Sequence, residues 1–100
     1  MKIKYGSIPD SQFEDFRKRL HAWVHWCFFY AEKQDPKLDH YFEKIQKKIL
    51  GFNELLNCSD MVIELMTVLE AARFEYSQAQ HKTETYRQFI LNAHEIIDRL

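Results

Sequence analysis

Two histidines stand four residues apart early in the chain, His21 and His25. On a helix, side chains at this spacing lie one turn apart on the same face, where two imidazoles can share a metal ion. A third ligand would have to come from another segment, for example His40, His81 or His94. We keep a metal site at His21 and His25 as the alternative interpretation. The favoured one is two half-exposed histidines beside an aromatic patch, with no metal and no other cofactor.

A second pair of reactive side chains lies near the C-terminus, in the stretch RQFILNAH. Its Arg87 and His94 are separated by six residues, a spacing that resembles the short Arg–His signature of HEPN-type ribonucleases, which are small all-α domains that act as dimers. The resemblance implies that Arg87 would hold a phosphate and that His94 would be the general acid and base at the ribose 2′-hydroxyl. A dimeric ribonuclease is therefore one alternative function.

Basic side chains recur along the segment after Pro36. On a helix they would form one flank that could contact phosphates of a nucleic acid. Acidic residues interrupt the adjoining face and no exposed aromatic residues accompany the lysines, so a solvated face is favoured over a nucleic-acid interface. The lysines concerned are Lys37, Lys44, Lys47 and Lys48.

Four segments with the apolar period of an amphipathic helix position these side chains. We expect helices over about 8–33, 36–56, 60–78 and 84–100. Helix caps are predicted from Ser7 with Asp10, Asp35 before Pro36, Ser59 with Asp60, and Thr83. The short connections require neighbouring helices to be antiparallel. The sequence therefore predicts an all-α fold, an up-down-up-down four-helix bundle that forms a single domain over 1–100.

Composition agrees with this fold and narrows the class of protein. The 100 residues include only two glycines and two prolines, too few for the repeated turns of a β-protein, and the net charge is −1. Cys27 and Cys58 fall in or beside apolar segments, where free cysteine acts as a small hydrophobe in a reducing compartment. We expect a cytoplasmic protein with no membrane span and no small-molecule substrate.

The stretch HAWVHWCFFYAEK, residues 21–33, contains more aromatic residues than one buried stripe requires. On a helical wheel Trp23, Phe28 and Tyr30 point toward the core, whereas Trp26 and Phe29 point away from it, beside Ala22 and His25. Exposed Trp and Phe are typical of the centres of protein interfaces. The alternative is that neighbouring helices cover this face within the monomer.

These observations favour a non-enzymatic protein-interaction module of a regulatory, inhibitory or immunity type. The expected contact surface is Ala22, His25, Trp26 and Phe29, binding a protein partner, a second copy of the chain, or both. The ribonuclease that uses Arg87 and His94 and the nucleic-acid accessory protein that uses the lysine flank are the alternatives.

Overall fold

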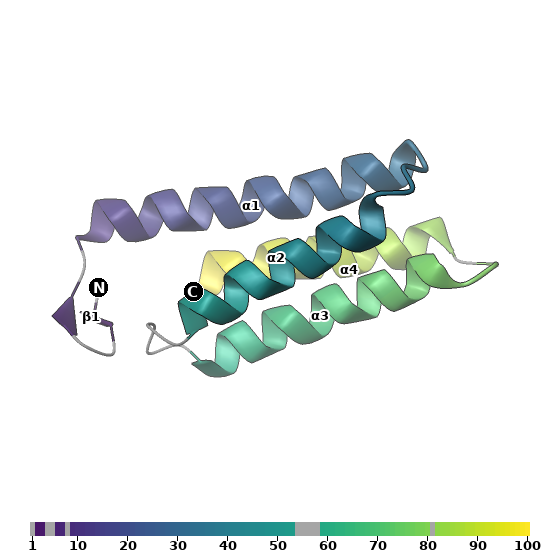
Figure 1. Ribbon diagram of the computed structural model, residues 1–100. Helices are drawn as coiled ribbons and strands as arrows, with labels where there is room; N and C mark the ends of the chain where they lie inside the picture. The colour runs from purple at the N-terminus through teal and green to yellow at the C-terminus, as the bar shows by residue number, and fades with distance from the viewer. Residues whose placement is uncertain (1, 4–5, 8, 54–58, 81) are drawn as a thin grey trace.

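Four antiparallel helices form the body of the molecule in a computed structural model that describes residues 2–3, 6–7, 9–53, 59–80 and 82–100. They are α1 (Asp10–Glu32), α2 (Leu38–Asn53), α3 (Ser59–Ser77) and α4 (Thr83–Arg99). Each helix packs against the next along the chain, and α4 returns to pack against α1 (Figure 1). The structure thus confirms the predicted helical bundle, an elongated molecule of 46 × 21 × 20 Å.

One apolar stripe from each helix makes the core, as the periodicity predicts. The side chain of Leu65 on α3, for example, is completely buried, as are those of Cys27 on α1 and Ile97 on α4. Trp23, Phe28 and Tyr30 are only half-buried and pack against the edge of the core. The wheel gave their direction correctly, but such large rings extend past the stripe of smaller residues to the margins of α1.

The beginning of α1 differs from the prediction. A short antiparallel hairpin of β1 (Lys2–Ile3) and β2 (Gly6–Ser7) precedes the helix, with Lys2 paired to Ser7. The residue that caps α1 is Pro9, whose carbonyl oxygen accepts hydrogen bonds from the backbone NH groups of Gln12 and Phe13, and no side chain caps the helix. The predicted capping box of Ser7 and Asp10 is therefore wrong, because Ser7 is held in the strand.

The turn from α1 to α2 is set by backbone hydrogen bonds. Gln34 has φ 53°, the left-handed conformation in which helices commonly end. Its NH donates to the carbonyl of Ala31 and the NH of Asp35 donates to the carbonyl of Tyr30, which is the Schellman pattern. The Asp35 carboxylate accepts from the NH of Lys37 at 2.8 Å, which supports the turn just before α2; the helix itself begins at Leu38, two residues later than the predicted start.

The remaining helix ends agree with the prediction within a few residues. α2 is described to Asn53, and its predicted continuation to 56 lies outside the described residues. α3 begins at Ser59, one residue before the predicted start, and the cap of Ser59 with Asp60 stays a prediction. Thr83 is the first residue of α4 and not its cap, since Lys82 precedes the helix and no side chain makes a capping hydrogen bond there. Among the described residues, no helix has the length and apolarity needed to cross a lipid bilayer.

Candidate functional site

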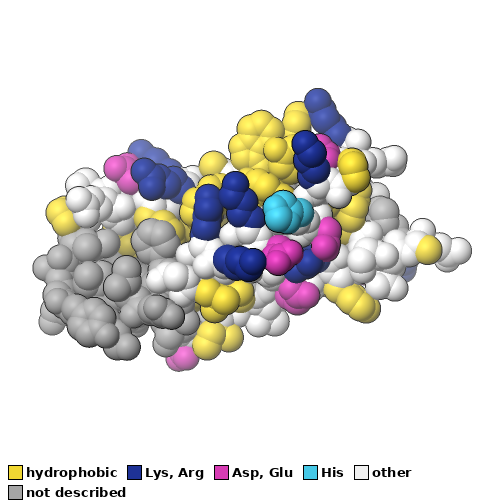
Figure 2. Space-filling view, in the orientation of Figure 1, with side chains coloured by type: hydrophobic (Ala, Val, Ile, Leu, Met, Phe, Trp, Pro, Cys, Tyr) yellow, Lys and Arg dark blue, Asp and Glu magenta, His cyan; other side chains and the backbone are white. Residues whose placement is uncertain are grey.

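The outer face of α1 carries the four residues that the sequence predicted as a contact surface, Ala22, His25, Trp26 and Phe29, which we call the aromatic surface. Trp26 is 43% exposed, and Ala22 and His25 are exposed as well. Phe29 is half-buried. Figure 2 shows hydrophobic side chains gathered over α1, with Lys and Arg side chains near them. The face that should be solvated in an ordinary bundle helix is therefore partly apolar.

Contacts between rings hold the aromatic surface together. The ring of Trp26 meets that of Phe29 edge-on at 5.1 Å and lies 5.7 Å from the ring of Tyr30. Tyr30 continues the series to Tyr41 of α2 at 5.1 Å. The ammonium group of Lys33 lies 4.5 Å from the centre of the Phe29 ring. These neighbours explain why Phe29 is less exposed than the wheel predicted, and they limit the motion of the indole.

Four other large apolar side chains are exposed, but they are scattered over three helices: Leu50, Ile63, Phe74 and Leu91. Leu50 and Phe74 line a shallow groove between α2 and α3. Within the described ranges, none of these side chains belongs to a run of aromatic rings like that on α1. The aromatic surface is therefore distinguished by the clustering of its rings.

A second group of chemically interesting side chains lies between α1 and α4. His21 Nδ1 and His94 Nδ1 are 2.7 Å apart, and His21 Nε2 is 2.8 Å from Asp98 Oδ1. The two imidazole rings are inclined by 17°, with centres 5.0 Å apart. In each ring the Nδ1 atom lies one ring radius from the ring centre. The observed distance between the two ring centres is therefore possible only when the rings extend in opposite directions from the Nδ1–Nδ1 contact. They therefore meet edge to edge through an in-line hydrogen bond.

The positions of the protons in this network, His21, His94 and Asp98, follow from its partners. An ionised carboxylate only accepts, so His21 Nε2 carries the proton that is donated to Asp98. In neutral His21 the Nδ1 atom is then an acceptor, and the donor is the Nδ1–H of His94. Desolvation, and then the neighbouring His21, lower the pKa of His94. Among the residues that the structure describes, the other ring nitrogen, His94 Nε2, has no hydrogen-bond partner, and it is not a buried unpaired atom.

Arg87 lies in the same region as His94. Both line a pocket of ≈ 290 Å³ together with His25, Phe28 and Leu91. The Arg87 guanidinium donates to the Glu32 carboxylate at 2.9 Å, with both side chains about half exposed. The two residues that the ribonuclease resemblance singles out therefore share one pocket. Arg87 is thus held in an ion pair with Glu32, and Asp98, one turn after His94 on α4, bonds His21.

The histidine pair suggested as metal ligands is not brought together. The ring of His25 turns toward Trp26, with ring centres 6.2 Å apart, while His21 bonds to His94. In the part of the chain that the structure describes, no three His, Cys, Asp or Glu side chains are arranged to hold a metal ion. His40 is exposed on α2, and His81 lies outside the described residues. Of the proposed third ligands, the fold brings His94 to His21.

The four lysines that suggested a nucleic-acid interface are exposed on or just before α2. This exposure agrees with the solvated face that the sequence predicts. Lys47 forms an ion pair with Glu43 at 3.4 Å. The Lys48 ammonium lies 4.9 Å from the centre of the Trp23 ring on α1. Two of the four are thus engaged within the molecule, and contact of this flank with a nucleic acid stays a prediction.

Cys27 lies at the centre of the bundle, where burial raises the pKa of its thiol to about 12. Such a thiol is unreactive at neutral pH. The backbone carbonyl of Cys27 accepts a hydrogen bond of 2.8 Å from the hydroxyl of Tyr86, whose side chain reaches across from α4. Cys58 lies outside the described residues. Cys27 therefore has a structural role.

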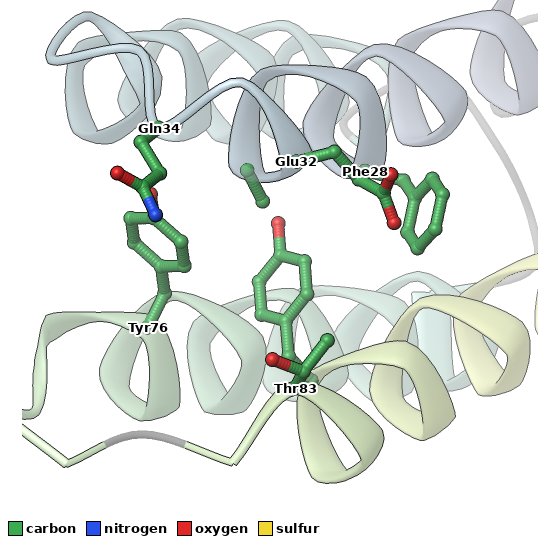
Figure 3. A pocket seen from close by; sticks show the side chains of 7 residues that line it. Phe28, Glu32, Gln34, Tyr76 and Thr83 are labelled. Carbon is green, nitrogen blue, oxygen red and sulfur yellow. The ribbon is translucent and has the colours of Figure 1, made fainter.

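Tyr86 also lines a pocket of ≈ 200 Å³ at the end of the bundle, between α1, α3 and α4. In Figure 3, Gln34 and Tyr76 point toward each other on one side of this pocket, and Phe28 and Glu32 come from α1 on the other. None of the residues predicted for a site is among those that line it. Its wall combines the aromatic rings of Phe28, Tyr76 and Tyr86 with polar side chains such as Glu32 and Gln34, and we assign it no chemistry.

Asp98 belongs to the hydrogen-bonded network between α1 and α4, but it was not predicted as a site residue from the sequence. A signal was present, since Asp98 follows His94 by four residues, as His25 follows His21. Only the pairing of α1 with α4 shows that the two pairs face each other.

Comparison of the chain with models of protein families, with curated proteins and with solved structures gave no match.

Proposed function

We propose that this chain is a protein-binding module and that it binds its partner through the aromatic surface on α1. The observation that carries the proposal is the exposure of Trp26, 43% of whose surface is accessible although its ring is packed against two neighbouring aromatic rings. A side chain that is already ordered loses little conformational freedom on binding, so most of the free energy gained by burying its surface contributes to affinity. Trp is also the residue type most enriched at interface centres.

The charges around the aromatic surface favour an acidic partner. Lys33 lies beside Phe29 at one end, while Lys18 and Arg19 are exposed one turn before Ala22 at the other. A partner with an apolar cavity edged by carboxylates would be complementary to this arrangement. A second copy packed antiparallel on α1 would bring Lys33 near Lys18 and oppose like charges. We therefore expect a different protein as the partner and a monomer in the absence of that partner.

The proposal is tested by replacing Trp26 with Glu and using Ile63→Glu as the matched control. Ile63 is 57% exposed on α3, so both changes put a carboxylate on an exposed position. Tagged wild-type chain and both variants would capture proteins from the source organism, followed by affinity measurement on the partner identified by mass spectrometry. Trp26→Glu should weaken binding by about 30-fold or more, the effect of losing an interface centre, with Ile63→Glu unchanged. Equal capture by wild type and Trp26→Glu would reject the proposal.

Two further measurements complete this test. Circular dichroism should give the same helical content and melting temperature, within a few degrees, for all three proteins, because both positions are exposed. Native mass spectrometry should give the mass of one chain for the wild type. If the wild type is a dimer and Trp26→Glu dissociates it, the binding partner of the aromatic surface is instead a second copy of the chain.

A second candidate is RNA cleavage, the activity implied by the resemblance to HEPN-type ribonucleases. It is favoured by one observation: Arg87 and His94 line the same pocket, and the Nε2 of His94 has no hydrogen-bond partner among the residues that the structure describes. A general base needs such an unpaired nitrogen. Incubation of single-stranded RNA with wild type and His94→Ala in the presence of EDTA tests this. Cleavage by the wild type that His94→Ala abolishes would support it, and intact RNA with both proteins would reject it.

A further inference from the structure

The pocket of ≈ 290 Å³ between α1 and α4 has the size of a small ligand site. Pockets for small molecules have volumes of roughly 300–1,000 Å³, so this one is at the lower end. Neither helix forms it alone, which is why the sequence predicts no small ligand. Both helices contribute to its lining: His25, Phe28, Arg87, Ile90, Leu91 and His94.

The lining combines apolar walls with one permanent positive charge. Leu91 is 56% exposed and Phe28 is half-buried, so a ligand that covers them removes apolar surface from water. The guanidinium of Arg87 is protonated at every physiological pH. Among the residues that the structure describes, no acidic side chain lines this pocket. A ligand that fits must therefore offer an apolar part next to a negative charge.

The Arg87 guanidinium is held in place and still has donors for a ligand. Its central carbon lies 5.5 Å from the centre of the Phe28 ring, and one terminal nitrogen donates to Glu32 at 2.9 Å. Glu32 lines the neighbouring pocket of ≈ 200 Å³ and not this one. A guanidinium has five N–H donors, and within the described ranges the hydrogen bond to Glu32 uses one of them. The others can bind a carboxylate with two parallel hydrogen bonds.

We propose that this pocket binds an apolar monocarboxylate, with its carboxylate on Arg87 and its hydrocarbon part against Phe28 and Leu91. A single negative charge suits the pocket better than a phosphate dianion, because Glu32 offsets part of the Arg87 charge and repels a second anion. Inorganic phosphate would also leave the apolar walls uncovered. A free acid and the C-terminal residue of a peptide present the same chemistry. The proposal does not depend on protein binding through the aromatic surface, although His25 belongs to both places.

The test is titration of the intact ¹⁵N-labelled chain with 3-phenylpropionate at pH 7.5, followed by the amide signals in NMR spectra. We expect saturable shifts, largest for the lining residues, with a Kd of about 0.1–1 mM for so small a ligand. The alcohol 3-phenylpropan-1-ol lacks the charge, and inorganic phosphate lacks the apolar part. Both should bind at least about 10-fold more weakly.

Two substitutions with matched controls locate the ligand. Arg87→Gln should weaken binding of 3-phenylpropionate by about 10-fold or more, because the charged donors are lost. Arg99→Gln should leave it unchanged, although Arg99 is also an exposed arginine of α4 that is paired with a glutamate, Glu64, at 3.3 Å. Leu91→Ala should weaken binding by about 3–10-fold, whereas Leu50→Ala, at a position that is 52% exposed on α2, should not. Circular dichroism verifies that each variant is folded.

A second titration identifies the source of the carboxylate. It uses a short peptide that ends in phenylalanine, with a free or an amidated C-terminus. Tighter binding of the free-carboxyl peptide than of 3-phenylpropionate would identify a peptide end as the ligand, and binding of 3-phenylpropionate alone would identify a free acid. Equal binding of the amidated peptide would overturn the assignment of a carboxylate.

Three further outcomes would overturn the proposal. They are the absence of saturable shifts in the wild type, equal affinity for the acid and the alcohol, and equal weakening by Arg87→Gln and Arg99→Gln. The protein-binding function fails or succeeds separately, because the acid titration uses no partner protein and the capture experiment uses no acid.

Discussion

α1 is held to its two neighbours in different ways. Toward α4 it makes directional hydrogen bonds, from His21 to His94 and to Asp98, and from the Tyr86 hydroxyl to the Cys27 carbonyl. Toward α2 the contacts of its outer edge are between rings or between a ring and a cation, as in Tyr30 with Tyr41 and Trp23 with Lys48. One side is fixed in register by polar atoms, and the other is a less specific apolar margin.

The difference explains where each candidate site lies. Hydrogen bonds across an interface require particular atoms at particular positions, so the α4 side places chemically active groups accurately. Contacts between rings depend mainly on area and tolerate several geometries, so the α2 side can continue outward into the exposed aromatic surface. The α4 side therefore holds its polar groups in fixed positions, and the α2 side continues into the outer face for which we propose partner binding.

The largest expected effect is on the free energy of unfolding when one tyrosine ring is removed from the α4 side or from the α2 side of α1. Tyr86 is almost completely buried and Tyr41 is half-buried. Tyr86→Ala should lower the free energy of unfolding by about 3–5 kcal/mol, since it leaves a cavity as well as an unmade hydrogen bond. Tyr41→Ala should lower it by clearly less, because water can refill the space. Urea denaturation of both variants measures the difference, and equal losses would show that the two sides are not distinct.

A smaller effect is expected in the pH dependence of the free energy of unfolding, and it arises on the α4 side alone. The pKa of His94 is lowered from its ordinary value of 6.5, so below that pH the unfolded chain binds more protons than the folded chain. The free energy of unfolding should therefore fall as the pH drops below about 6.5 toward the lower pKa of the folded state, in buffer that contains EDTA. His94→Gln should reduce this dependence, whereas His40→Ala should retain it. A slope that is the same in all three proteins would contradict this prediction.

The smallest effect is expected at the exposed ion pair of Arg87 with Glu32, which also joins α4 to α1. Both side chains are about half exposed, and such pairs contribute roughly 0–1 kcal/mol. Arg87→Gln should therefore change the free energy of unfolding by less than about 1 kcal/mol, and by less still at high salt. A larger loss in thermal or urea unfolding would mean that Arg87 stabilises the α4 side as strongly as the buried groups do.

Most of the fold could be predicted because its signals are local. The apolar period of each segment gave the helices, and the short connections gave their antiparallel order. The exposure of Trp26 could also be predicted, since all residues of the aromatic surface lie on one helix. The capping box of Ser7 and Asp10 failed because the hairpin, which competes for Ser7, depends on pairing between two strands.

The sequence by itself determined which side chains each helix buries and which it exposes, because a helix converts spacing along the chain directly into direction around its axis. Only the tertiary structure decided that His21 meets His94 and Asp98 and that Arg87 meets Glu32. Those contacts join residues 55 to 77 positions apart in the chain, and their register depends on how the cores of α1 and α4 pack. No periodicity within one helix contains that information.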